Sequence, residues 1–289
     1  RGEPRLKPPF PGVAGLFQMP TVLNNTETMA NVPLILRDGA QSYRSFGTEK
    51  NPGTNLFTIC ELIEHPGVYE FPLGTSIRTV LNAVGFDPDQ VKALQVGGGV
   101  SGSLIGADQL DATLDIEGMV AAGGSLGTGS IRVFGPKANM VALCRDVAEF
   151  FMDESCGKCT PCRYGTRQMA QILANLADGC GTEDVVSELC SLSTYITDNS
   201  RCAFGAAAST VLLSAMRLFP EEFKPGGKTS FGKTAGSGKQ TSFEKTAGLA
   251  KPACSKKLEK DRNQEAADAD GASLEQSETD KESGRGGER

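Results

Sequence analysis

The sequence predicts an α+β protein with several parts, in which a small β-grasp unit precedes a four-helix bundle and a polar tail. Three observations predict it. Residues 46–138 alternate strand-like segments with turns, residues 139–222 carry apolar residues at helical spacing, and residues 223–289 contain few large apolar residues. The chain of 289 residues is long enough for about two domains of ~150 residues with buried cores.

Residues 1–45 open with a Pro-rich extended segment, and the stretch that follows is typical of a loop with a helical turn. Nothing in these residues closes on itself, so we expect them to be the end of a larger domain. Residue 1 is Arg rather than Met, and no secretory signal follows it. We therefore expect the chain to be a fragment or a processed product.

Residues 46–138 predict a β-grasp domain. Two strand-like segments, 56–62 and 68–71, flank a His-Pro-Gly turn and therefore predict a hairpin. Thr75 is placed to cap a helix, and a further strand is expected at 93–96. One face of that helix is apolar, with Ile77, Val80, Leu81 and Val84. A hairpin, one helix and further strands are the elements of a β-grasp arrangement.

Residues 139–222 predict four helices with short connections, so a four-helix bundle is the economical arrangement. The third helix opens at Thr182 and the fourth spans 206–218. We expect Cys144 and Cys190 to be small core residues on apolar helix faces. Apolar faces define the first three helices: Met140, Val141, Cys144, Val147, Phe150 and Phe151; Met169, Ile172, Leu173 and Leu176; Val185, Val186, Leu189, Leu192 and Ile196.

Residues 223–289 predict a disordered, low-complexity tail, because so few large apolar residues cannot offset the entropy of ordering the chain. The phrase KTSFGKTAG at 228–236 returns in altered form at 239–248. Charge is blocky, since 224–260 hold nine basic and two acidic residues whereas 261–289 hold four basic and nine acidic residues. Such a segment is either a solvated extension or an electrostatic tether for an acidic partner.

Composition excludes several classes of function. No stretch approaches the ~18 uninterrupted apolar residues of a membrane-spanning helix, and a net charge of −6 argues against a general nucleic-acid binder. The single histidine, His65, excludes a His-cluster metal site and disfavours a Ser–His or Cys–His triad. Nine cysteines spread along a long chain indicate a reducing compartment, the cytoplasm or an organelle matrix, with thiols for metal or redox work.

The motif ESCGKCTPCRYGT is the sharpest signal for function. Cys156, Cys159 and Cys162 stand at strict three-residue intervals, so a loop wrapped around a cubane can present each sulfur to one corner. A fourth ligand must come from elsewhere, and Cys202 is the natural candidate because it lies in a loop between the third and fourth predicted helices. The spacing therefore predicts a [4Fe–4S] site at one end of the bundle.

Other interpretations of the cysteines stay open. A structural zinc site usually draws on two separated CxxC pairs rather than a triplet and a lone cysteine, and a local disulfide or buried free thiols are further alternatives. We expect Cys60 to be a core residue, Cys180 a turn residue, and Cys254 a tail residue without a function. Lys158 and Arg163 flank the motif, where cations would favour the reduced state of a negatively charged cluster.

The cysteine motif, followed 40 residues later by RCAFG, is similar to the C-terminal half of the NADH-binding flavoprotein subunit of respiratory complex I. The same module occurs in NAD-linked hydrogenases and NAD-dependent formate dehydrogenases. The segment RGEPRLKPPFPGVAGLFQMPTVLNNTETMANVP resembles the end of that family's α/β FMN domain, and residues 46–138 resemble its soluble-ligand-binding β-grasp domain. The resemblance covers residues 1–222.

This resemblance implies a function and a set of cofactors. The family transfers a hydride from NADH to FMN and passes single electrons to a [4Fe–4S] cluster and on to partner iron–sulfur subunits of a multisubunit complex. It implies that Leu23, Asn24, Asn25 and Thr28 line the FMN pocket, and it implies no catalytic acid or base in this chain. The family's Gly-rich FMN loop and the rest of its nicotinamide pocket have no counterpart here. An isolated electron-relay or docking module and a zinc-stabilised interaction module are the alternatives.

Overall fold

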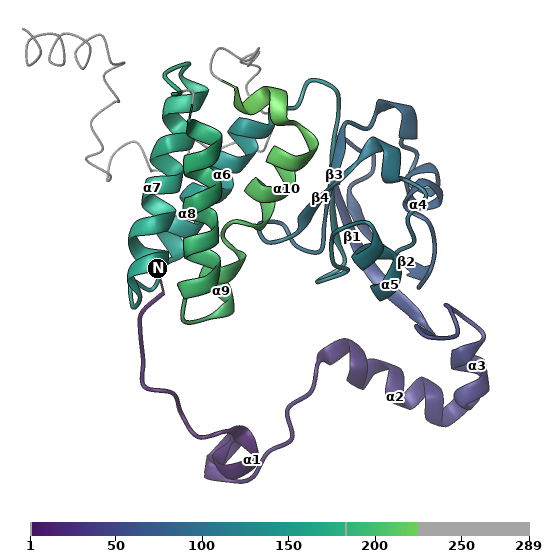
Figure 1. Ribbon diagram of the computed structural model, residues 1–289. Coiled ribbons are helices and arrows are strands. Elements are labelled where there is room, and N and C mark those ends of the chain that lie inside the picture. Colours follow the sequence, from purple (N-terminus) through teal and green to yellow (C-terminus); the bar gives the residue numbers. More distant parts are fainter. Residues whose placement is uncertain (1, 183, 225–289) are drawn as a thin grey trace, which may run out of the picture. The chain divides into compact units, whose positions relative to one another are not determined.

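The computed structural model describes residues 2–182 and 184–224 of the chain. N-terminal helices come first, a five-stranded sheet follows, and a group of longer helices completes the described part (Figure 1). The predicted tail lies outside the described residues from 225 onward. Among the residues that are described, no helix is both long enough and apolar enough to cross a membrane.

The N-terminal segment is more helical than the sequence predicts. It contains α1 (Pro11–Ala14), α2 (Thr26–Asp38) and α3 (Ala40–Arg44), none of which buries a residue. A helix of 13 residues, which begins after Asn25 as its cap, replaces the single helical turn expected here. Asn25 Oδ1 accepts the backbone N–H of Glu27 at 2.8 Å and so satisfies a free donor at the start of α2.

A mixed five-stranded sheet follows, with strand order β2-β1-β5-β3-β4. The predicted hairpin is confirmed, because β1 and β2 pair antiparallel around the expected turn. β5 pairs parallel with β1 and antiparallel with β3, and β3 pairs antiparallel with β4. The strands are β1 (Thr54–Glu61), β2 (Gly67–Pro72), β3 (Ala93–Val96), β4 (Ser103–Gly106) and β5 (Ser130–Phe134).

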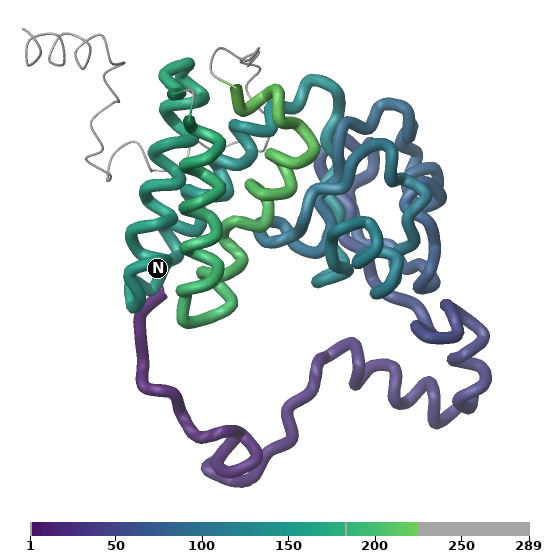
Figure 2. The backbone as a smooth tube through the Cα atoms, viewed as in Figure 1, coloured from purple at the N-terminus to yellow at the C-terminus, as the bar shows by residue number. Residues whose placement is uncertain are grey.

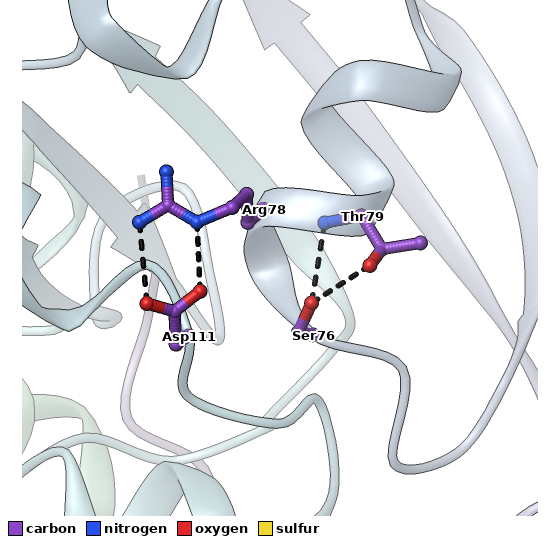
Figure 3. A network of polar contacts seen from close by, with 4 residues as sticks. All are labelled: Ser76, Arg78, Thr79 and Asp111. Carbon is purple, nitrogen blue, oxygen red and sulfur yellow. Dashed lines mark hydrogen bonds and ion pairs between the residues drawn. The ribbon is translucent and has the colours of Figure 1, made fainter.

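The helix predicted after the hairpin is α4 (Ile77–Ala83), and its apolar face is buried as predicted. The predicted cap is wrong by one residue. Ser76 caps α4, because its Oγ accepts the N–H of Thr79 at 3.2 Å, whereas Thr75 Oγ1 donates to the carbonyl of Pro72. Figure 3 shows this cap beside Arg78, which pairs with Asp111 across 2.7 Å. A second helix, α5 (Ile116–Ala121), completes this sheet part of the protein, residues 54–134.

The helical part, residues 140–223, contains α6 (Met140–Glu154), α7 (Thr160–Ala177), α8 (Val185–Asn199), α9 (Ala203–Ala207), α10 (Thr210–Leu218) and a short 3-10 helix, η4 (Pro220–Phe223). α6, α7 and α8 lie side by side (Figure 1), and α10 packs on α6 and α8. Two predicted boundaries are wrong. The third helix starts at Val185 rather than Thr182. The fourth is divided into α9 and α10, and Figure 2 shows the backbone path of this part of the chain. Between the two helices, Ser209 Oγ donates to the carbonyl of Ser193.

Two predicted core positions in the helices are exposed. Cys190 is exposed because the buried residues of α8 are spaced four, four and three apart, which leaves Cys190 just outside the stripe that Leu189 belongs to. Phe150 is 40% exposed at the edge of the α6 face. Cys144 is buried, and this prediction is confirmed.

The helices and one face of the sheet share a core. Leu104 of β4 and Phe134 of β5 belong to the same apolar cluster as α6, α7, α8 and α10. Leu104 also donates its N–H to Ser214 Oγ of α10 at 3.0 Å. Phe223 is fully buried in this core, so the predicted start of the tail at 223 is wrong, because the chain remains packed through η4.

Candidate iron–sulfur site

The first cysteine loop joins α6 to α7. Ser155 follows the last residue of α6, and Gly157 adopts φ +74°, a left-handed backbone that glycine tolerates and that turns the chain. Cys156 is exposed and Cys159, directly before α7, is half-buried. Cys162 lies in the first turn of α7 and is 5% exposed. All three cysteines therefore lie at the same end of the α6–α7 helix pair.

The second loop, residues 200–202, joins α8 to α9. Cys202 is exposed and stands directly before the first residue of α9. Gly205 of α9 lets this loop approach α7 closely. A Cβ added at Gly205 would lie 2.4 Å from Ser200 Oγ and 3.1 Å from Cys162 Cβ, so no other residue fits without moving one of the two loops.

The charges of the four thiols interact at Cys162. Burial raises the pKa of the Cys162 thiol, and the nearby thiols of Cys159, Cys156 and Cys202 raise that pKa further because like charges repel. The hydrogen bond from Ser155 acts in the opposite direction. The thiols of the triplet and of Cys202 are therefore near enough to Cys162 for their charges to affect it.

Backbone donors favour the charged form of Cys159. The N–H of Arg201 lowers the pKa of the Cys159 thiol most, and burial opposes it. The N–H groups of Cys162 and of Cys159 itself lower that pKa further, as expected for a thiol at the start of a helix. Arg201 precedes Cys202, so this contact links the two loops directly.

The flanking cations behave differently from each other. Arg163 donates through Nη1 to the carbonyl of Gly157 at 3.4 Å, and its guanidinium lies 4.7 Å from the centre of the Tyr164 ring. Lys158 lies on the loop and is exposed. Arg163 therefore helps to hold the first loop in shape as well as placing positive charge beside it.

The donor set suits a cluster. Within residues 2–182 and 184–224, no three His, Cys, Asp or Glu side chains converge tightly enough to hold a single metal ion. A cubane offers a separate iron atom to each of four thiolates, so its ligands are spread more widely than those of one ion. Four cysteine sulfurs from two facing loops are the ligands that a [4Fe–4S] cluster takes.

The residues implied for FMN binding lie elsewhere, before and in the first turn of α2. Leu23, Asn24 and Asn25 are exposed, and so is Thr28. Asn25 Oδ1 is engaged as the cap of α2. These four side chains therefore lie together on one short, exposed segment.

Three residues beside the ligands were missed by sequence reasoning. They are Ser155, Arg201 and Gly205, and each is a direct or near neighbour of a cysteine in ESCGKC or RCAFG. Their position next to cysteines in the two motifs is the sequence signal that could have identified them. Of the other cysteines, Cys60 in β1 is half-buried rather than fully in the core, and Cys180 is half-buried in the turn after α7.

The two cysteine loops lie in a part of the chain that is similar to a known iron–sulfur region. Residues 142–226 match the family model described as the NADH-ubiquinone oxidoreductase-F iron–sulfur binding region. The helical part of the chain is therefore similar to an iron–sulfur binding region.

Relatives of known name are similar to most of this chain. It is 41% identical over 224 residues to the F subunit of NADH-quinone oxidoreductase from Mycobacterium tuberculosis strain H37Rv, a match that covers 77% of this chain and 50% of that protein. It is 38% identical over 238 residues to the protein of the same name from Escherichia coli K12, covering 81% and 53%. The HndC subunit of the NADP-reducing hydrogenase of Solidesulfovibrio fructosivorans is 38% identical, covering 78% and 46%.

A solved structure extends this likeness to the fold. The crystal structure of NAD⁺-reducing [NiFe]-hydrogenase in the H₂-reduced state matches with a TM-score of 0.67 and 33% identity, over 76% of this chain and 37% of that one. These matches confirm the resemblance predicted from the cysteine motif. The chain spans about half the length of the curated relatives it matches.

Proposed function

We propose that this chain is the electron-relay half of an NADH:acceptor oxidoreductase subunit. Cys156, Cys159, Cys162 and Cys202 are the proposed ligands of its [4Fe–4S] cluster. One observation carries this proposal, namely that the two cysteine loops, 40 residues apart in sequence, approach so closely that a Cβ at Gly205 would lie 3.1 Å from Cys162 Cβ. The iron–sulfur binding region matched by residues 142–226 supports it.

The protein's contribution is to hold the ligands and set their surroundings. When bound, the flavin of such a subunit converts the two electrons of a hydride into single electrons, and the cluster supplies a one-electron site. Three of the proposed ligands offer thiolates near the surface, namely Cys156, Cys159 and Cys202. The fourth, Cys162, is buried in the first turn of α7 and would anchor the site to that helix. The N–H of Arg201 favours the thiolate of Cys159. No residue of this chain is proposed as a catalytic acid or base.

The proposed division of the chain follows the family. Residues 1–45 would complete an α/β FMN domain, 46–138 would form a β-grasp domain, and 139–222 would form a four-helix bundle. The hairpin and α4 support the second assignment, and the packing of α6, α7, α8 and α10 supports the third.

FMN and NADH are proposed cofactor and substrate of the full-length protein. Leu23, Asn24, Asn25 and Thr28 would line one side of the flavin pocket, where uncharged amide and hydroxyl groups can hydrogen-bond flavin oxygens. Their exposure leaves these side chains open to such a ligand. The names of the relatives, which are oxidoreductase and hydrogenase subunits, support NADH chemistry.

The proposed partners are iron–sulfur subunits of a multisubunit complex in the cytoplasm or an organelle matrix. Several relatives are named as subunits of such enzymes. Two exposed ligands, Cys156 and Cys202, support electron transfer at the surface of this chain. An isolated electron-relay module, without hydride chemistry, is the second candidate. It is favoured because the proposed flavin contacts come from one short segment, which would line only one side of a pocket.

Anaerobic reconstitution of the full chain with iron and sulfide tests the proposal. We expect about four iron atoms and four sulfides per chain, and a brown protein whose broad visible absorption dithionite bleaches. A colourless protein that takes up zinc and no iron would contradict the cluster and support a zinc-stabilised interaction module. Flavin titration separates the other two candidates, because a relay module should not retain yellow FMN.

A further inference from the structure

Ser155 lies among the proposed ligands without being a ligand itself. It follows α6 directly, precedes Cys156 and is 2% exposed. Its Oγ lies 3.3 Å from the sulfur of Cys162 and 3.2 Å from the backbone nitrogen of Gly157. A buried hydroxyl group that has these two neighbours in the described part of the chain has a restricted choice of hydrogen bonds.

The direction of the bond to sulfur follows from the second contact. Gly157 donates its N–H to Ser155 Oγ, so the hydroxyl oxygen acts as acceptor there and its own proton is available for another group. A cysteine that binds iron has lost its thiol proton and can only accept. The Ser155 hydroxyl must therefore donate to the sulfur of Cys162 when that residue is a ligand.

The surroundings hold this pair in place. Cys162 is 5% exposed, so water does not compete well for its sulfur, and a hydrogen bond in such a site is strengthened by the low local dielectric. Thr166, which is fully buried, donates through Oγ1 to the carbonyl of Cys162 at 2.7 Å and fixes that residue in α7. Ser155 acts on the sulfur, whereas Thr166 acts on the backbone of the same residue.

We infer that Ser155 is a positioning residue whose hydroxyl donates to the Cys162 thiolate and raises the reduction potential of the cluster. This inference rests on the proposed function. The reduced cluster carries one more negative charge than the oxidised one, so a donor at a ligand sulfur stabilises the reduced form more. The hydroxyl keeps its proton in both states, and one electron is exchanged with an external donor.

A redox titration of the full chain tests this. After anaerobic reconstitution, the reduced-state EPR signal is followed against the applied potential in the parent and in Ser155→Ala. We expect the Ser155→Ala midpoint to be more negative. The expected fall in the reduced-to-oxidised ratio at the parent midpoint is about tenfold, equivalent to about 59 mV for one electron. An unchanged midpoint would overturn the inference.

Two further variants separate the bond to sulfur from packing. Thr166→Val removes a buried hydroxyl that bonds the backbone of the same cysteine, so it should lower stability and leave the midpoint unchanged. Ser155→Thr keeps a hydroxyl and should restore the parent midpoint. A shift in Thr166→Val as large as that in Ser155→Ala, or a failure of Ser155→Thr to restore the midpoint, would also overturn it.

Iron analysis distinguishes a failure of the proposed function from a failure of the inference about Ser155. Absence of a cluster in the parent chain would contradict the proposed function and not the role of Ser155 as such. If Ser155→Ala does not load iron, Ser155→Gly provides a second variant without the hydroxyl. If neither loads iron while the parent does, Ser155 has a structural role and the inference about the potential is wrong.

Discussion

Burial distinguishes the four proposed ligands from one another. Cys162 is almost inaccessible, whereas Cys156 and Cys202 are exposed and Cys159 lies between these extremes. A buried thiolate is costly unless a positive group compensates its charge. Iron would provide that compensation at Cys162, and the exposed cysteines complete the coordination from the surface. The buried and the exposed cysteines would thus contribute to the site in different ways.

Replacing the distant ligand tests the site at the level of one residue. Cys202→Ala should leave a three-ligand site that holds fewer than four iron atoms per chain, measured by iron analysis and the reduced-state EPR signal. Cys190→Ala is the matched control, because Cys190 is an exposed cysteine in the same region. We expect Cys190→Ala to keep its iron and to change the free energy of unfolding by no more than about 0.5 kcal/mol. Full iron content in Cys202→Ala would show that the fourth ligand is misassigned.

At the scale of elements, the site depends on how closely α9 approaches α7. Gly205 leaves no room for a side chain between Ser200 and Cys162. The cysteine loops are also joined by the N–H of Arg201 at Cys159. The contact between two short loops therefore decides whether four sulfurs surround one space.

Enlarging Gly205 should separate the loops. In Gly205→Ala the new methyl group would meet Ser200 and Cys162, so we expect reduced iron content and a loss of about 1–3 kcal/mol in the free energy of unfolding, as for overpacked cores. Gly99→Ala is the control, because no heavy atom lies within 4 Å of a Cβ at Gly99. Equal iron content in the two variants would argue against a close loop contact.

A second element contact should respond to pH. The Arg78 guanidinium lowers the pKa of Asp111 through their hydrogen bonds, so the unfolded chain binds a proton more readily than the folded one (Figure 3). The stabilisation is present above the ordinary Asp pKa of about 3.9 and is lost as the pH falls through the lower folded value. Urea unfolding should therefore give a small difference between the parent and Asp111→Asn at pH 7, and this difference should shrink as the pH falls below the ordinary Asp pKa. A difference that persists in acid would point to another cause.

For the whole molecule, the sheet part and the helical part are joined by more than their shared core. Lys92, just before β3, donates to Glu222 of η4 and to the carbonyl of Ala138. Glu222 also accepts the N–H of Met140 at 2.9 Å, at the start of α6. Less than a quarter of the Lys92 and Glu222 side chains is exposed, so this junction is partly protected from water.

Removing the charge of Glu222 at this junction should lower the free energy of unfolding of the whole molecule. In Glu222→Gln the Lys92 ammonium loses its charged partner, and we expect the free energy of unfolding to fall by about 1–2 kcal/mol in urea titrations followed by circular dichroism. Glu221→Gln is the matched control, since Glu221 pairs only with exposed Lys224 in the described structure and should change stability by less than about 0.5 kcal/mol. Similar losses in both variants would contradict a special role for the Lys92–Glu222 pair.

Much of the local structure was predictable because it depends on short-range patterns. The hairpin turn, the apolar face of α4 and the stripes of α6 and α7 follow from residue spacing along the chain. Helix ends were less predictable, because caps such as Ser76 and Asn25 compete with neighbouring residues of similar chemistry. Cys190 was misplaced because its burial depends on which side of α8 faces the other helices.

The sequence by itself determined the kind of chemistry, since three cysteines at three-residue intervals limit the candidate cofactors whatever the fold. Only the tertiary structure decided that the loop carrying Cys202 lies beside the first turn of α7, where Gly205 faces Cys162. That meeting depends on the lengths of α7 and α8, which return the chain to the same end, and on the gap left by Gly205. It also decided that Ser155 faces the Cys162 sulfur. The positions of these residues along the sequence do not reveal whether their side chains meet, because that depends on how the helices pack.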